Sequence, residues 1–249
     1  MATIKQIVDK AYTKVNGEYE SITDGSDDFR TYLNVLNQVM EMWWHTPYVN
    51  WQSLFDPHFT LPDSIAAGVF EYTVPDSPEI KIANSPFDHV FIMDDAILVK
   101  TYKLTDQALY QSAKSGDICA YFGNKLYFKN ISDDMVGLQI CLPVYVMPTV
   151  YTAGTQVVNI DSVPWLVARI AAFICDSSPV PFIARNADKF YKEAEVYMKE
   201  MKDNNRHRQH LAIKSPGRVF GDARFNSLSA AIDAGVGVAG LNSVDGGTF

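Results

Sequence analysis

Cysteine and long apolar segments are scarce in this chain of 249 residues. Its three cysteines, Cys119, Cys141 and Cys175, are too few for a disulfide framework, and no CxxC pair occurs. No apolar run approaches the ~20 residues that a membrane helix needs. Asp9 and Lys10 interrupt the region where a signal peptide is apolar. We therefore expect a soluble protein made in a reducing cytoplasm.

Positive charge is also scarce, and its distribution is uneven. The net charge of −8 argues against a protein that wraps nucleic acid or coats an anionic membrane. Residues 1–198 carry net −10, residues 199–224 net +4 and residues 225–249 net −2. Hydrophobic residues make up 47% of the chain, enough for a large core. The 14 Phe and 13 Tyr are a surplus that is common where subunits bury surface.

The first 47 residues predict two helices. Apolar residues recur at a spacing of three to four from Ile4 onwards, with Thr3 as the N-cap and Gly17 as the stop. Ser26 is the expected N-cap of the second helix, whose apolar face ends before Pro47.

The middle of the chain is typical of strands, because short β-branched and aromatic runs alternate with turn residues. Gly123 and Asn124 favour a two-residue hairpin turn, and residues 104–113 predict a short helix between strands. The alternation over residues 136–142 predicts a half-buried strand. The other expected strands cover residues 68–74, 90–102, 118–122 and 125–128.

Helices return after about residue 160. One is apolar on most sides and carries Pro164 in its first turn, where proline is tolerated. After a break from Ser178 to Pro181, the longest helical pattern of the chain runs to about residue 203.

These patterns predict an α+β fold, with a helical bundle formed by the N- and C-terminal helices. The bundle would comprise residues 1–47 and 160–203, and a β-rich insertion would occupy residues 48–159. Residues 204–249 are rich in glycine and serine and poor in large apolar residues, so they cannot build a core. We expect them to form an extended C-terminal tail.

Short motifs do not predict a catalytic or metal site. Residues 235–240 match GxGxxG but lack the strand, the helix and the acidic residue of a dinucleotide site. His207 and His210 have a metal-binding spacing but lie among cations, which would repel a metal. Adjacent carboxylates such as Asp94 and Asp95 are typical of turns and caps. We therefore expect no catalytic residue, no cofactor and no metal.

Five stretches, residues 3–12, 27–44, 121–128, 160–172 and 187–202, follow one another as helix, helix, hairpin, helix and helix. In order and spacing they resemble the head-to-tail adaptor (connector) proteins of tailed bacteriophages. That family includes the tail accessory factors and tail tubular proteins of short-tailed phages. The resemblance covers roughly residues 3 to 203, and each stretch alone is an ordinary amphipathic pattern.

The resemblance implies a virion structural protein without enzymatic activity. Such proteins form a ring, typically of twelve copies, below the portal, where the ring extends the DNA channel and docks the next tail component. The implied partners are the portal protein, a downstream tail or nozzle protein, and genomic DNA that passes without specific binding. No membrane is involved, and the expected location is the neck or tail of a virion assembled in the host cytoplasm.

The tail would make the contact with the portal or with a neighbouring copy. The expected contact residues are Arg206, Arg208, Lys214, Arg218, Phe220, Arg224, Phe225 and Leu228.

Two alternative functions stay open. One is a tail or baseplate protein that binds a surface glycan through exposed Trp43, Trp44 or Trp51, although core packing is the more ordinary role of such residues. The other is a cytoplasmic enzyme whose site is assembled only in the folded chain.

Overall fold

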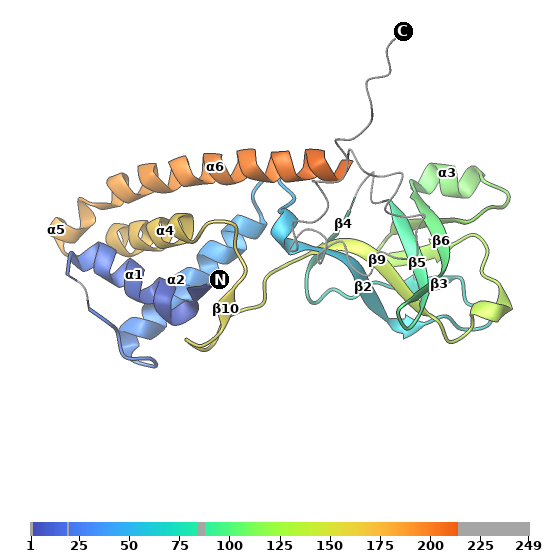
Figure 1. The fold of residues 1–249 in the computed structure, drawn as a ribbon, viewed down its shortest axis with the longest axis horizontal. Coiled ribbons are helices and arrows are strands. Elements are labelled where there is room, and N and C mark those ends of the chain that lie inside the picture. Colours follow the sequence, from blue (N-terminus) through green and yellow to red (C-terminus); the bar gives the residue numbers. More distant parts are fainter. Residues whose placement is uncertain (1, 19, 84–87, 214–249) are drawn as a thin grey trace, which may run out of the picture. The chain divides into compact units, whose positions relative to one another are not determined.

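The computed structural model describes residues 2–18, 20–83 and 88–213. About 40% of these residues are helical and about 26% lie in strands. The chain divides into two compact units, which we call the helical unit and the sheet unit (Figure 1). The helical unit contains the described parts of residues 1–56, 74–83 and 143–210, and the sheet unit contains those of residues 57–73, 84–142 and 211–249.

The predicted fold class is wrong. The strands are not an insertion in a helical bundle, because eight of them form one large curled sheet and the fold is mixed α/β. The strand order is β2-β9-β5-β6-β7-β8-β3, and β4 also pairs with β9. Strand β9 therefore joins segments from much earlier in the chain, and the local sequence pattern does not show such pairings.

The helical unit is built from helices at both ends of the chain. Its short strands β1 and β10 form a separate antiparallel pair. Its elements are β1 (Ala2–Thr3), α1 (Ile4–Asn16), α2 (Asp27–Trp44), the 3-10 helix η1 (Gln52–Leu54), β4 (Ile80–Ile82), β10 (Val157–Val158), α4 (Val163–Asp176), α5 (Pro181–Ala184) and α6 (Ala187–Ile213), whose last three residues are assigned to the sheet unit.

Helix α1 begins and ends where the sequence predicted, with Thr3 as its N-cap and Gly17 at its C-terminal end. The Thr3 side chain accepts a hydrogen bond from the Gln6 amide, and the Gln6 side chain accepts one from the Thr3 amide, so a capping box is complete. Gly17 ends the helix in the left-handed region, at φ 81°. Ser26 likewise caps α2 by accepting a hydrogen bond from the Phe29 amide.

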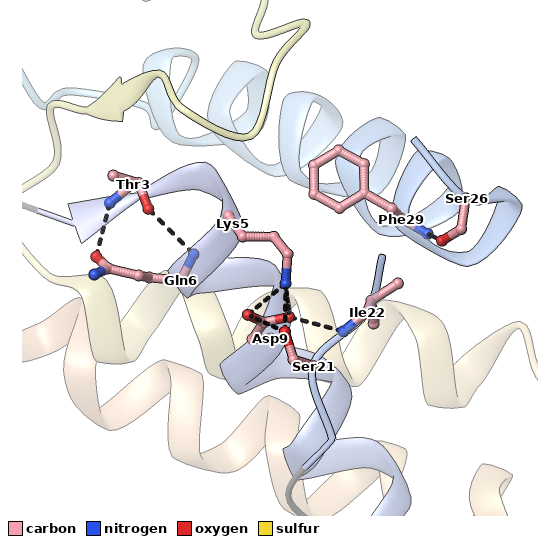
Figure 2. A network of polar contacts seen from close by, with 8 residues as sticks. All are labelled: Thr3, Lys5, Gln6, Asp9, Ser21, Ile22, Ser26 and Phe29. Atoms are coloured by element: carbon pink, nitrogen blue, oxygen red, sulfur yellow. Dashed lines mark hydrogen bonds and ion pairs between the residues drawn. The ribbon is translucent and has the colours of Figure 1, made fainter. Parts of the chain in front are cut away.

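One carboxylate connects α1 to the loop that follows it (Figure 2). Asp9 accepts hydrogen bonds from Lys5 Nζ at 2.6 Å and from the Ile22 amide at 3.0 Å. Lys5 Nζ also donates to Ser21 Oγ at 2.7 Å. The loop is thus held on α1 by a polar network as well as by the burial of the Ile22 side chain.

Helix α4 is the core of the helical unit and contacts both α1 and α2. Ser162 caps it, and Pro164 lies in its first turn as predicted. Small residues on α4 allow neighbouring helices to approach closely, and large residues fill the remaining space. Its buried residues are Trp165, Leu166, Val167, Ala168, Ile170, Ala171, Ala172 and Cys175.

The sheet unit contains the strands that do not belong to the helical unit, wholly or in part. Strands β6 and β7 pair in parallel, with the short helix α3 between them in the chain, as the sequence predicted for residues 104–113. The elements are β2 (Phe55–Ser64), β3 (Glu71–Thr73), β5 (His89–Asp94), β6 (Ile97–Thr105), α3 (Gln107–Ser112), β7 (Ile118–Phe122), β8 (Lys125–Phe128), the 3-10 helix η2 (Asp133–Met135) and β9 (Gln139–Val146), of which β2 and β9 extend into the helical unit.

The predicted hairpin turn between β7 and β8 is confirmed. Gly123 and Asn124 both have positive φ, 58° and 56°, which is the requirement of a two-residue turn that matches the twist of the strands. The second hairpin, β5–β6, turns at Asp95, whose φ of 50° is a conformation that aspartate tolerates.

Strand β9 differs from its prediction as a half-buried strand. Six consecutive residues, 140–145, are buried, so both faces of the strand are covered. Its neighbours are β2 on one side and β5 and β4 on the other. The exposed face that the alternating sequence pattern implies is therefore covered in the folded chain.

Helix α6 continues through Ile213, beyond residue 204, where the sequence predicted that the tail begins. Asn205 explains part of this difference, because its side chain is buried and forms two hydrogen bonds that hold this part of α6 against residues 50–52. Its Oδ1 accepts from the Gln52 amide at 2.8 Å, and its Nδ2 donates to the Asn50 carbonyl at 2.9 Å. The remainder of the predicted tail, residues 214–249, lies outside the described residues.

Replacing Asn205 by alanine is expected to lower the free energy of unfolding by about 1–3 kcal/mol, because two partly buried backbone groups lose the Asn205 side chain as a partner. Urea denaturation followed by circular dichroism measures the change. Asn204→Ala, at an exposed position next to it, is the matched control. Equal effects of the two substitutions would show that the buried hydrogen bonds do not stabilise α6.

Candidate interaction surfaces

The structure describes little of the predicted tail contact. Arg206 is exposed and lies 3.9 Å from Asp203, one turn earlier on α6. Arg208 belongs to α6, but its side chain is not among those described. The other predicted contact residues lie outside the described chain: Lys214, Arg218, Phe220, Arg224, Phe225 and Leu228.

The three tryptophans of the glycan hypothesis are buried. The rings of Trp43 and Trp51 lie 5.2 Å apart, and Trp51 Nε1 donates a hydrogen bond to the Trp43 carbonyl at 2.8 Å. Lys81 covers Trp44, with its Nζ 3.9 Å from the ring centroid and 2.7 Å from the Trp44 carbonyl oxygen. Burial lowers the pKa of Lys81, and Glu79 partly opposes this shift. These indoles are core residues and offer no exposed ring for a sugar.

The cysteines and adjacent carboxylates considered as chemical groups lie in the core, at a helix start or in a turn. Among the three cysteines, which are all buried, burial raises the thiol pKa of Cys119 and Cys175. Asp27 lies in the first turn of α2, and Asp95 in the β5–β6 turn. Within residues 2–18, 20–83 and 88–213, no group of three or more His, Cys, Asp or Glu is placed to hold a metal.

An exposed apolar surface lies at the C-terminal end of α4. Phe182, on α5, is 76% exposed, and Val180 immediately before α5 is also exposed. We call these two residues the α5 surface. Next to it is a cleft of about 330 Å³, which is lined by Lys14, Val15, Asn16, Gly17, Phe182, Asn186, Lys189, Phe190 and Glu193.

The cleft has a defined wall. Lys14 Nζ is 2.7 Å from Glu193 Oε1 and 5.2 Å from the Phe190 ring centroid, so the end of α1 is connected to the start of α6. Phe182 therefore lies beside a cleft whose wall joins the end of α1 to the start of α6. The apolar Phe182 side chain in this exposed position is a candidate contact for another protein surface.

Two further exposed apolar residues precede α4 in the chain. Val150 is 70% exposed, and Val157 on β10 is also exposed; we call this pair the β10 surface. The Asn37 side chain fixes the loop behind Val150, since it accepts from the Tyr151 amide at 2.9 Å and donates to the Tyr151 carbonyl at 3.0 Å.

Helix α4 lies between the two pairs of residues in the chain. Its 14 residues make a helix about 21 Å long. The α5 surface follows the helix in the chain, and the β10 surface precedes it. Phe182 lines a cleft with Gly17, just after α1, whereas Val157 pairs with Thr3, just before α1, so these two exposed side chains lie near opposite ends of α1.

No protein-family model matches the chain, and no curated protein matches it. Within the described part of the chain, no helix combines the length and the apolar character that crossing a bilayer requires. Functional inference therefore depends on the exposed surfaces themselves.

Sequence reasoning missed both surfaces. A weak signal was present in the break between helices, where Val180 and Phe182 alternate with two prolines in a segment too short for a core element. Val150 and Val157 gave no such signal, because isolated valines at the end of a β-rich region are equally typical of buried strands.

Proposed function

We propose that this protein is a virion structural protein, a head-to-tail adaptor that forms a ring below the portal of a tailed phage. The ring extends the DNA channel and docks the next tail component. The observation that carries the proposal is that the helical unit exposes two different sets of apolar residues, one at Phe182 and the other at Val157. The order of helices and hairpin along the chain, which resembles the adaptor family, supports the same function.

A closed ring needs two different surfaces on each subunit. In a cyclic assembly of more than two copies, a patch on one subunit meets a different patch on the next, and this contact repeats until the ring closes. The α5 surface and the β10 surface meet this requirement. Phe182 of one copy would lie against Val150 and Val157 of the next, which removes all three side chains from water.

The charge of the chain suits a channel through which DNA passes. Net −10 over residues 1–198 repels phosphate, so genomic DNA would move past the ring without specific binding. The portal on one side and a tail or nozzle protein on the other would be the protein partners.

Mixing two single-surface variants tests the ring directly. Phe182→Asp places a charge on the α5 surface and Val157→Asp places one on the β10 surface, so each variant alone is expected to stay monomeric in native mass spectrometry. Mixed in equal amounts, they should form dimers and nothing larger, because each retains one complementary surface. Wild-type protein should form rings, alone or on portal-bearing heads.

The matched control is Val196→Asp, at an exposed valine in the middle of α6, which should still form rings. A wild-type protein that stays monomeric even with portal-bearing heads would contradict the proposal. Rings formed by either single-surface variant would show that these two surfaces are not the subunit contacts.

A further inference from the structure

The tip of the β5–β6 hairpin has three consecutive exposed apolar residues, Ile97, Leu98 and Val99. Ile97 is 68% exposed. Neighbouring residues of a strand point to opposite faces, so exposure of all three means that neither face of this tip is covered. The register shifts here: Met93 pairs with Leu98 and the residue before it with Lys100, which leaves Val99 unpaired at a bulge.

The outer edge of the tip is also open. Strand β7 is the second neighbour of β6, but it pairs only with Lys103, Leu104 and Thr105. The Lys103 amide donates to the Asp117 carbonyl on that side, and amides alternate along a strand, so the Thr101 amide faces the same side. In the described chain no strand pairs with this side of residues 97–101. Such an edge can accept an added strand.

The tip is acidic as well as apolar. Asp94 and Asp95 are exposed at the turn, and neither forms an ion pair within the described residues. Lys100, the cation nearest along the chain, is held by Asp117 at 2.8 Å. A ligand that complements the tip therefore needs positive charge beside apolar side chains.

The chain itself contains such a segment. Residues 214–228 place Arg218 directly before Val219 and Phe220, and Arg224 directly before Phe225. The 36 residues that follow α6 can span up to about 120 Å when extended, enough to reach a neighbouring molecule.

We propose that the β5–β6 hairpin tip is the docking site for residues 214–228 of this chain. The arginines would lie beside Asp94 and Asp95, and the apolar residues on Ile97 and Val99. Within the proposed ring, the neighbouring copy supplies the segment. The docking itself does not require the chain to be a phage adaptor.

The test is binding of a fluorescein-labelled peptide of residues 214–228, measured by fluorescence anisotropy. The acceptor is the full-length protein carrying Phe220→Asp and Phe225→Asp, so that its own segment does not compete. We expect saturable binding that weakens as sodium chloride is raised. Adding Val99→Asp to the acceptor should weaken binding at least about tenfold.

Two controls keep the result interpretable. Val136→Asp changes a comparably exposed valine elsewhere in the sheet unit and should leave binding unchanged. Asp95→Asn preserves the turn, because asparagine tolerates positive φ, and should reduce both the affinity and its dependence on salt. This variant tests the proposal even if Val99→Asp fails to fold.

Three results would overturn the docking site. The first is that the peptide does not bind the acceptor. The second is that the peptide binds the Val99→Asp and Val136→Asp variants equally well. The third is that the acceptor dimerises without peptide and that Val99→Asp abolishes the dimer, which would mean that the hairpins of two copies pair with each other. Native mass spectrometry of the same proteins tests the ring separately. Rings without peptide binding contradict only the docking site, and peptide binding without rings contradicts only the adaptor proposal.

Discussion

Replacing Trp51 by alanine is expected to lower the free energy of unfolding of the helical unit by about 3–5 kcal/mol. The Trp51 ring is fully buried against Trp43 and donates its N–H to the Trp43 carbonyl near the end of α2. The substitution opens a cavity and removes one of the hydrogen bonds to that carbonyl, which still accepts from the Thr46 amide at 3.1 Å, so the loss comes mainly from the cavity.

Urea denaturation followed by circular dichroism at 222 nm measures this loss. Tyr48→Ala is the matched control, because Tyr48 is an aromatic residue close to Trp51 in the chain and its side chain is fully exposed. The control is expected to change the free energy by less than about 0.5 kcal/mol. If both substitutions had the same small effect, the cluster of Trp43 and Trp51 would not be part of the stabilising core.

Phe128→Ala is the corresponding test of the sheet unit, with an expected loss of about 3–5 kcal/mol. Phe128 is buried on β8, and its ring makes edge-on contacts with Tyr102 at 4.9 Å and with Tyr72 at 5.8 Å. Aromatic pairs in this geometry stabilise the fold beyond the burial of their apolar area, so removing the Phe128 ring also removes its contacts with Tyr102 and Tyr72.

Hydrogen exchange measured by mass spectrometry shows which part of the sheet unit loses stability in Phe128→Ala. Peptides from β7 and β8 should exchange faster in Phe128→Ala, since local opening becomes easier. Phe70→Ala is the control: the Phe70 side chain is exposed, and only its backbone carbonyl, which the substitution retains, bonds to the Phe128 amide. Unchanged exchange of β7 and β8 in Phe128→Ala would contradict the role of Phe128.

The features that sequence reasoning predicted correctly are local. The cap of α1 depends on Thr3 and Gln6, three residues apart, and its end depends on the backbone freedom of Gly17. The β7–β8 turn depends on two adjacent residues that accept positive φ, Gly123 and Asn124. Each of these elements has its physical cause within a few residues.

Local sequence patterns could not predict that the three tryptophans Trp43, Trp44 and Trp51 are all buried. Trp43 and Trp44 are adjacent on α2, and a helical pattern alone places one of them less deeply than the other. In the structure Lys81, from β4, covers Trp44 while Trp51 packs on Trp43, so both rings are buried. The covering residue lies far along the chain, and nothing in the sequence near Trp44 indicates it.

The sequence by itself determined the caps, the β7–β8 turn and the positions of α1, α2 and α4, because these depend on neighbouring residues and their backbone preferences. Only the tertiary structure decided that the strands form one eight-stranded curled sheet, since β9 pairs with segments distant in the chain. It also decided which apolar residues stay exposed. Phe182 and Trp51 are both large and apolar, and only the packing of the folded chain leaves the first in water and buries the second.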